Sequence, residues 1–267
     1  MKLSLSTRSI GTLVRYGARA LAAASFLVLG SAAFAAGGAV RLDTFPTTKL
    51  TDQAALQNGA KLFMNYCLGC HGLSQVRYNK LRELGLNEEQ IKTNLILTSA
   101  KFGDPIMTTL NLKDAAQWFG KAPPDLSLTA RSRSSHSGTG ADWIYTYLRS
   151  YYLDPARPTG WNNLTYPAVG MPHVLWELQG QNEATYKTVQ DHGHEMQVFD
   201  KFVQKTKGTQ SASDYDNTVA DLTAFLAWAA EPAALERKQI GVWVLLFLAV
   251  FFVFAWRLNA AFWKDIK

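Results

Sequence analysis

Apolar side chains recur at helical spacing in four segments of the chain, which predicts four helices in a central domain. These segments are 49–66, 87–97, 141–152 and 216–230. In the first of them Leu56, Gly59 and Phe63 fall on one face of a helix. The last is expected to end at Glu231-Pro232, because the residue before a proline disfavours helical geometry.

The segments between these helices predict loops. Gly, Pro, Ser and Thr occur throughout 101–140 and 154–215, and the strong alternation of apolar and polar residues that is typical of strands is absent from the sequence. We therefore expect a mainly α domain with long loop insertions. Helices joined by long loops need something else to pack around, and a large prosthetic group would supply it.

The N-terminal segment has the pattern of a secretory signal peptide. Its basic residues end at Arg19, an apolar run covers 20–34, and Ala33-Phe34-Ala35 fits a small-x-small cleavage site. An uncleaved anchor helix is the weaker interpretation, because the apolar run is short and rich in alanine. We predict a signal peptide over 1–35 and a mature chain that begins near Ala36.

A second apolar run, 240–256, lies near the C-terminus and holds 17 residues without a charge. As a helix it extends about 26 Å, slightly less than a hydrocarbon core of about 30 Å. Arg237, Lys238 and Lys264 bracket the run, and every face of it is apolar, which disfavours a buried core helix. We predict a transmembrane anchor followed by a short cytoplasmic tail over 233–267.

The two ends together predict an orientation. A cleaved signal exports the body of the chain, and the C-terminal helix then stops transfer. We expect a single-pass protein of the inner membrane, with the domain 36–232 on the periplasmic side.

The formal net charge of +6 indicates an anionic partner only as long as the signal peptide is counted. Four of the 27 Lys and Arg residues lie in 1–35, which holds no acid, so 23 basic residues face 21 acidic ones in the rest of the chain. Nucleic acid therefore loses most of its electrostatic support as a partner and is not expected.

The first predicted helix leads directly into Cys67-Leu68-Gly69-Cys70-His71, which is the C-x-x-C-H attachment pattern of c-type haem. Two thiols three residues apart on one turn can each form a thioether with a haem vinyl group, and the next histidine is then placed under the iron as its proximal ligand. The chain has only these two cysteines. We predict one covalent haem c held by Cys67, Cys70 and His71.

Two other interpretations of the cysteine pair are weaker. A redox dithiol is expected in a thioredoxin-like β-α-β context, which the sequence does not show. A zinc site that adds His192 and His194 has a spacing that fits no common zinc finger.

An electron carrier has both axial positions of its haem filled, so a sixth ligand is needed. The candidates that follow the motif are Met107, Met171, Met196, His136, His173, His192 and His194. Met171 is favoured, because Gly170 and Pro172 on either side indicate a tight turn that presents the thioether with little chain entropy left to lose. Thioether sulfur also suits haem iron. Met107 and a histidine stay open as alternatives.

Several further motifs make the chain resemble the cytochrome c1 family, the membrane-anchored haem c subunits of the cytochrome bc1 complex (ubiquinol:cytochrome c oxidoreductase), in their bacterial type. Besides C-x-x-C-H, the resemblance rests on Ala122-Pro123-Pro124-Asp125-Leu126-Ser127, Arg131-Ser132-Arg133, Val169-Gly170-Met171-Pro172, the run from Asp221 to Pro232, and Arg237-Lys238 before the anchor. The Pro-Pro-Asp-Leu-Ser segment and the junction with the anchor are far more specific than C-x-x-C-H alone.

The resemblance implies roles for individual residues. It makes Met171 the sixth ligand and places Pro123 and Pro124 beside the haem on its histidine side. It also implies that Arg133 meets a haem propionate with Trp143 assisting, although Arg131 is close enough to take that role. Judged from the sequence alone, Pro-Pro is more often a rigid connection, and an arginine in a loop is usually solvated.

The resemblance further implies electron transfer. The chain would accept electrons from a Rieske iron–sulfur protein and donate them to a soluble cytochrome c, in a membrane complex with cytochrome b. It would be no enzyme by itself, since both axial positions are filled. One alternative is a stand-alone membrane-anchored cytochrome c that shuttles electrons to an oxidase. Another is a haem sensor or peroxidase with an open iron site.

Overall fold

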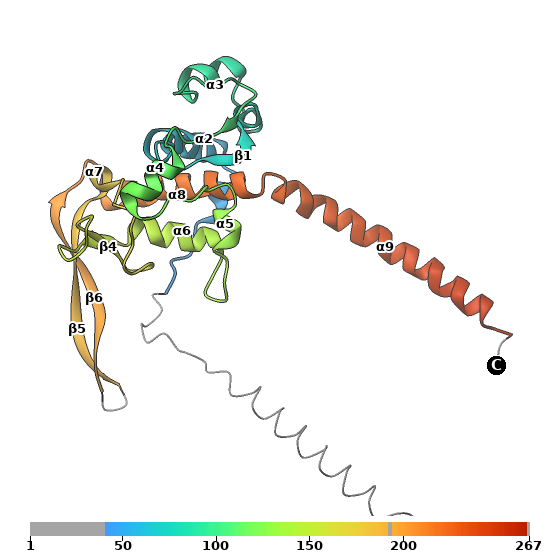
Figure 1. Ribbon diagram of the computed structural model, residues 1–267. Helices are drawn as coiled ribbons and strands as arrows, with labels where there is room; N and C mark the ends of the chain where they lie inside the picture. Colours follow the sequence, from blue (N-terminus) through green and yellow to red (C-terminus); the bar gives the residue numbers. More distant parts are fainter. Residues whose placement is uncertain (1–40, 192–193, 266–267) are drawn as a thin grey trace, which may run out of the picture. The chain divides into compact units, whose positions relative to one another are not determined.

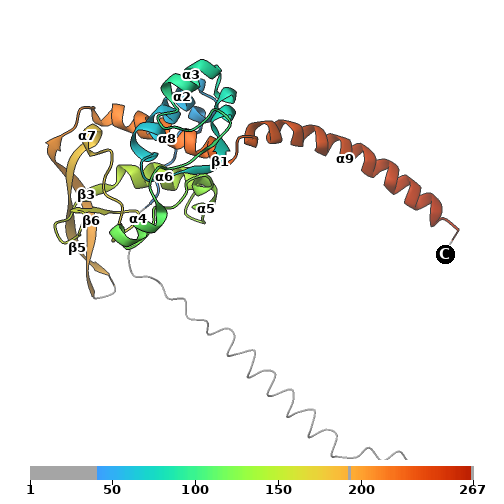
Figure 2. The same ribbon diagram turned by 45° about the horizontal axis from the view of Figure 1, so that its top comes forward.

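The structure of the protein is a computed structural model that describes residues 41–191 and 194–265, so the predicted signal peptide lies outside the described residues. The domain is mainly α-helical, as predicted, and a long apolar helix follows it. Helix α8 (Ala212–Ala230) lies between α2 (Gln53–Leu62) and α6 (Gly140–Arg149) and packs against both (Figures 1 and 2).

The packing of α2 on α8 is close because α2 has a glycine at the crossing. A Cβ atom at Gly59 would lie 2.1 Å from the backbone oxygen of Asp221 and 2.6 Å from the Cβ of Phe225. One turn further on, the rings of Phe63 and Phe225 meet with their centroids 5.9 Å apart, and both side chains are fully buried. The small residue thus lets the two backbones approach so that the aromatic side chains meet beside them.

Gly59→Ala is therefore expected to destabilise the domain by about 1–3 kcal/mol, because the added methyl group must push α2 and α8 apart. The measurement is the denaturant midpoint of the full-length protein in detergent. Gly103→Ala is the matched control, since a Cβ atom there has no neighbour within 4 Å. Equal midpoints for the two variants would contradict the close packing.

The predicted helices are confirmed with shifted ends. The first is divided into η1 (Thr47–Leu50), α2 and η2 (Phe63–Cys67), and the others are α3 (Glu88–Asn94), α6 and α8. A capping box starts two of them, formed by Asn87 with Gln90 at α3 and by Thr139 with Asp142 at α6. A further short helix, η3 (Tyr78–Leu84), precedes α3.

The prediction that 154–215 is irregular is wrong. This region contains α7 (Trp176–Gln179) and a long antiparallel hairpin of β5 (Gly180–Asp191) and β6 (His194–Lys207). Apolar residues lie on both faces of the hairpin, with Tyr186 opposite Phe199 on one face and Val189 opposite Met196 on the other. Two register shifts interrupt the pairing as well. These features remove the simple alternation that would have predicted strands.

The other region predicted as a loop, 101–140, also holds regular elements. It contains α4 (Leu112–Phe119) and α5 (Thr129–Ser132), while β2 (Pro105–Ile106) pairs with β1 (Leu73–Arg77). A second small sheet joins β3 (Tyr151–Leu153) to β4 (Trp161–Asn163). These short elements fix the loops around the C-x-x-C-H motif and Met171.

The C-terminal helix α9 (Ala234–Phe262) confirms the predicted anchor and begins earlier than the uncharged run. Its segment Glu236–Phe262 holds 27 residues, and none of its most apolar 18-residue stretch is buried. At about 1.5 Å per residue this segment extends about 40 Å, which is enough to cross a bilayer. It is the one helix with the required length and apolar character in the part of the chain that the structure describes. The described part of the protein thus has a single transmembrane helix.

Candidate haem-binding site

The π-helical turn η2 ends at Cys67, and Cys70 follows three residues later. In η2 the Leu68 N–H donates to the Phe63 carbonyl oxygen at 3.0 Å, and the His71 N–H then donates to the Cys67 oxygen at 2.8 Å. Cys67 is buried, whereas Cys70 is exposed. Burial, and then the charge of Cys70, raises the pKa of the Cys67 thiol to about 12. The two thiols therefore leave the same turn toward different surroundings.

His71 has the hydrogen bond that an iron-binding histidine needs. Its Nδ1 lies 2.7 Å from the Pro124 carbonyl oxygen. A carbonyl can only accept, so Nδ1 carries the proton and Nε2 keeps a free lone pair for a metal. Burial also lowers the pKa of His71, although the bond to Pro124 and the charge of Asp125 act in the opposite direction. The lowered pKa favours the neutral imidazole. The residues of the motif thus fit a haem c with His71 as its proximal ligand.

The segment that carries Pro124 is itself fixed. The Asp125 carboxylate accepts from the Ser74 N–H at 2.8 Å and from the Ser127 N–H at 2.9 Å. The Leu126 N–H donates to the Gly72 oxygen at 2.9 Å. Burial opposes ionisation of Asp125, but the hydrogen bonds outweigh it and hold the pKa below its ordinary value. The Pro123-Pro124 segment therefore lies against the motif, while its contact with haem stays a prediction.

Met171 is half-buried against the core, in a loop whose constraint differs from the predicted one. The left-handed residue is Ala168, with φ 61°, and Gly170 does not adopt a positive φ. The Ala168 N–H donates to Asn162 Oδ1 at 2.9 Å, which offsets the strain of this conformation. The loop is thus preset three residues before the methionine rather than next to it.

Two buried asparagines, Asn162 and Asn163, hold this loop and are not among the predicted site residues. Asn163 Oδ1 accepts from the N–H groups of Thr165 and Tyr166 at 2.9 and 3.0 Å, and its Nδ2 donates to the Tyr147 oxygen at 2.7 Å. Neighbouring asparagines at the end of a strand are a turn signal that could have pointed to this role. They connect the loop of Met171 to the end of α6.

The other candidate ligands have different surroundings. Met107 is 49% exposed, His136 and His194 are exposed, and Met196 is half-buried on β6. His192 lies outside the described residues.

His173 is the one buried histidine among these alternatives for which the structure gives a position. Its ring stacks on Tyr151 with centroids 4.7 Å apart and meets Trp161 edge-on at 5.1 Å. Burial lowers the pKa of His173 to about 4. Its ring thus lies in an aromatic cluster, where Nε2 has no hydrogen-bond partner among the described residues, whereas Met171 is half-buried against the core.

Arg133 and Trp143 lie together, and Tyr147 lies between Trp143 and Met171. The Arg133 guanidinium carbon lies 4.4 Å from the Trp143 ring centroid and 5.5 Å from that of Tyr166. Trp143 in turn stacks on Tyr147 at 4.8 Å, and the Tyr147 hydroxyl donates to Met171 Sδ at 3.5 Å. The cation is therefore connected to the methionine through two stacked rings.

If Arg133 meets a haem propionate, Arg133→Gln is expected to lower the midpoint potential, because a positive charge near the haem favours the reduced state. The measurement is a redox titration of the haem-loaded protein. Arg131→Gln is the matched control on the same helical turn, and it is expected to shift the potential less. A larger shift for Arg131→Gln would transfer the role to Arg131.

The zinc alternative for the cysteine pair includes His192, which lies outside the described residues. Across residues 41–191 and 194–265, no cluster of three or more His, Cys, Asp or Glu side chains is arranged to hold a metal ion. The motif also follows a helical segment and not a strand.

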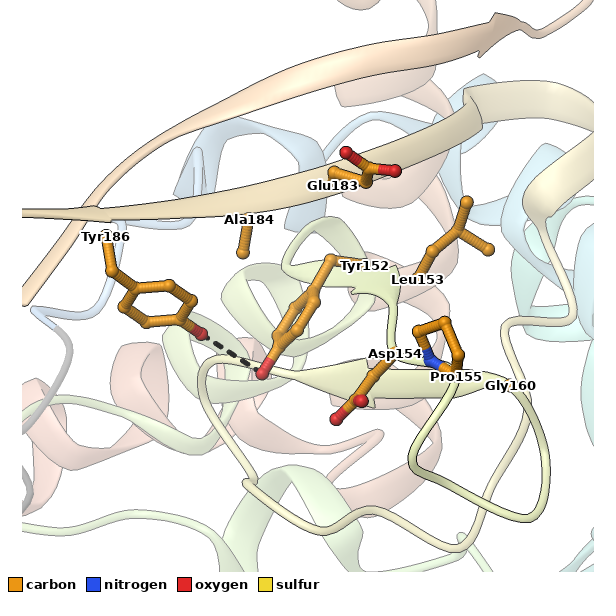
Figure 3. A pocket seen from close by; sticks show the side chains of 8 residues that line it. All are labelled: Tyr152, Leu153, Asp154, Pro155, Gly160, Glu183, Ala184 and Tyr186. Atoms are coloured by element: carbon orange, nitrogen blue, oxygen red, sulfur yellow. Dashed lines mark hydrogen bonds between the residues drawn. The ribbon is translucent and has the colours of Figure 1, made fainter.

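An open groove at the base of the hairpin is separate from this site. It is lined by the β3–β4 hairpin and by β5 (Figure 3), through Tyr152, Leu153, Asp154, Pro155, Gly160, Glu183, Ala184 and Tyr186. The Tyr186 hydroxyl donates to that of Tyr152 at 3.2 Å. The two carboxylates that line the groove already have partners, since Asn162 donates to Asp154 at 2.8 Å and Lys205 pairs with Glu183 at 2.9 Å. The groove contains no ligand residue for haem.

Comparisons with known proteins agree with the motif. The sequence profile described as the Cytochrome C1 family matches residues 44–266. A cytochrome c1 of Allochromatium vinosum is 46% identical over 251 residues, which are 93% of this chain and 99% of that protein. A protein of Nitrosomonas europaea named ammonia monooxygenase gamma subunit is 40% identical over 88% of this chain and 92% of its own length. A cytochrome c1 of Rhodospirillum rubrum is 32% identical over 93% and 97%.

Proposed function

The chain belongs to the cytochrome c1 family of haem c electron-transfer subunits, and we propose from this premise that it takes electrons one at a time from a Rieske iron–sulfur protein and passes them to a soluble cytochrome c. The observation that carries the proposal is the bond from His71 Nδ1 to the Pro124 oxygen, directly after the two cysteines. This bond leaves Nε2 available to iron.

The residues have the following proposed roles. Cys67 and Cys70 attach one haem c through thioethers, and His71 and Met171 are its axial ligands. Bound in this way, haem c supplies a one-electron ferric/ferrous couple. Pro123 and Pro124 support the histidine side, while Arg133 neutralises a propionate and Trp143 holds that arginine in place. Because both axial positions are filled, the chain carries electrons as a subunit and is no enzyme by itself.

The proposed topology places this site outside the cell's inner membrane. The signal peptide 1–35 is removed after export, the domain 36–232 stays on the periplasmic side, and 233–267 anchors it in the lipid bilayer. The apolar helix α9 supports the anchor.

Stopping the chain after Pro232 is therefore expected to release a haem-containing domain into the soluble periplasmic fraction. The measurement is the distribution of covalent haem between soluble and membrane fractions in cells that lack the partner subunits. The matched control is the full-length chain, which is expected to stay in the membrane. A truncated protein that remains membrane-bound would contradict a single anchor at the C-terminus.

Gentle purification from the membrane tests the function itself. We expect a cytochrome b and a Rieske iron–sulfur protein to accompany the chain. Recovery of the chain with an oxidase alone would favour the stand-alone shuttle, and recovery with other subunits would point to a complex such as the one for which the Nitrosomonas relative is named. A reduced-minus-oxidised spectrum of the same sample, with the methionine–iron band of the oxidised form, tests for a closed iron site and against a sensor or peroxidase.

A further inference from the structure

The hydroxyl groups of two buried tyrosines contact Met171. Tyr147 in α6 is 9% exposed, and Tyr151, the first residue of β3, is 1% exposed. The Tyr147 hydroxyl lies 3.5 Å from Met171 Sδ, and the Tyr151 hydroxyl lies 3.3 Å from the Met171 carbonyl oxygen. The two hydroxyl oxygens are 2.6 Å apart. Two of these polar contacts join the methionine to a hydroxyl group, and the third joins the two hydroxyl groups to each other.

The hydroxyl protons are too few for all three contacts. Each tyrosine hydroxyl has one proton to donate, and with an ordinary pKa of about 10 it keeps that proton near neutral pH. In one arrangement Tyr147 donates to the sulfur, and Tyr151 donates to the Tyr147 oxygen. In the other, Tyr147 donates to the Tyr151 oxygen, Tyr151 donates to the Met171 carbonyl, and the sulfur accepts nothing. A third arrangement would leave two hydroxyl oxygens 2.6 Å apart with no proton between them, which is repulsive.

We propose that Tyr147 is a positioning residue for the axial methionine. Its hydroxyl donates to Met171 Sδ when the ligated iron is ferrous and to the Tyr151 oxygen when the iron is ferric. The inference rests on the proposed function, in which Met171 is the sixth ligand. A thioether on ferric iron gives more electron density to the metal and is a poorer acceptor, whereas on ferrous iron it accepts better. Each arrangement contains two hydrogen bonds, and no proton leaves the pair.

The rings around the two hydroxyls are fixed, so only the hydroxyl hydrogens have to move. Trp143 stacks on Tyr147 with an interplanar angle of 12°, and His173 stacks on Tyr151 at 5°. Asn163 Nδ2 holds the Tyr147 backbone oxygen at 2.7 Å. A preorganised pair of this kind adjusts to the charge on the ligand without moving the ligand itself.

Two single substitutions in the full-length, haem-loaded protein test the proposal. Tyr147→Phe removes the donor to the sulfur, so the midpoint potential is expected to fall while the methionine–iron band persists. Tyr151→Phe removes the competing acceptor and leaves the sulfur as the remaining partner of Tyr147, so the potential is expected to rise. Tyr145→Phe is the matched control, since Tyr145 is equally buried on the same helix and contacts Phe45 and Arg149 instead. It is expected to leave the potential unchanged.

The opposite signs separate this proposal from a packing role. If both potentials fall with the band intact, the tyrosines merely shield the site and the exchange is wrong. A Tyr147→Phe potential equal to that of the unaltered protein would refute the bond to sulfur, and a Tyr151→Phe potential that does not rise would refute the competition. If the unaltered protein itself lacks the methionine–iron band, the axial role of Met171 fails, and the inference fails with it for that identifiable reason.

Discussion

Replacing Met171 with leucine is expected to lower the midpoint potential by a sizeable part of the roughly 0.8 V range over which axial ligands act. A thioether is a soft, neutral ligand that favours ferrous over ferric iron, and leucine keeps the volume while removing the sulfur. The methionine–iron band is expected to disappear, and the opened position is expected to bind carbon monoxide. Redox titration and optical spectra of the purified variant measure both effects.

Met107→Leu is the control for this substitution. Met107 is 49% exposed, so the spectrum and the potential are expected to stay intact. The comparison is sharp because Met107 is also near the motif, as its neighbour Thr108 donates to the Gly69 oxygen at 3.1 Å. If Met107→Leu loses the band and Met171→Leu keeps it, the sixth ligand belongs to the loop that follows β2.

Changing both Cys67 and Cys70 to serine is expected to abolish covalent haem. Each thioether needs its own thiol, so a single substitution leaves at most one attachment and the double substitution leaves none. The measurement is haem staining after denaturing electrophoresis of the membrane fraction. Haem that still migrates with the double variant would contradict the attachment.

The two single variants are expected to differ in stability. Cys67 is 8% exposed, so a serine hydroxyl there is buried among apolar side chains and needs a partner. Cys70 is exposed, and a serine there stays in contact with water. Thermal unfolding of the two proteins is expected to show the lower midpoint for Cys67→Ser. Equal midpoints would indicate that the bound haem, and not the protein, determines the surroundings of both thiols.

Features with local signals were predictable from the sequence. Asn87 before two glutamates caps α3, which begins one residue after the predicted start, and the long apolar stripe of α8 ends before Glu231-Pro232 as expected. The C-x-x-C-H motif and the uncharged run of α9 are local as well. In each case a few consecutive residues carry the physical cause, so no knowledge of distant parts of the chain was needed.

Features that depend on distant partners were not predictable. The hairpin of β5 and β6 is stabilised by pairs such as Tyr186 with Phe199, which become neighbours only through the register of the two strands. Gly170 and Pro172 predict a tight turn at Met171, but the left-handed residue is Ala168, whose N–H donates to the side chain of Asn162. The position of Tyr147 next to the sulfur likewise requires the loop to return to α6.

The π-turn of η2 sets the direction of the haem motif relative to the helix before it. The bond from the Leu68 N–H to the Phe63 oxygen places one more residue in the turn than an α-helix holds, and one residue rotates everything that follows by about 100° around the helix axis. Deleting a residue within 63–67 would restore α-helical geometry and send both thiols in another direction relative to the face that packs on α8. The helix type before the motif therefore sets the direction of both thiols. The same five residues grafted after a regular α-helix would present them on another side of that helix.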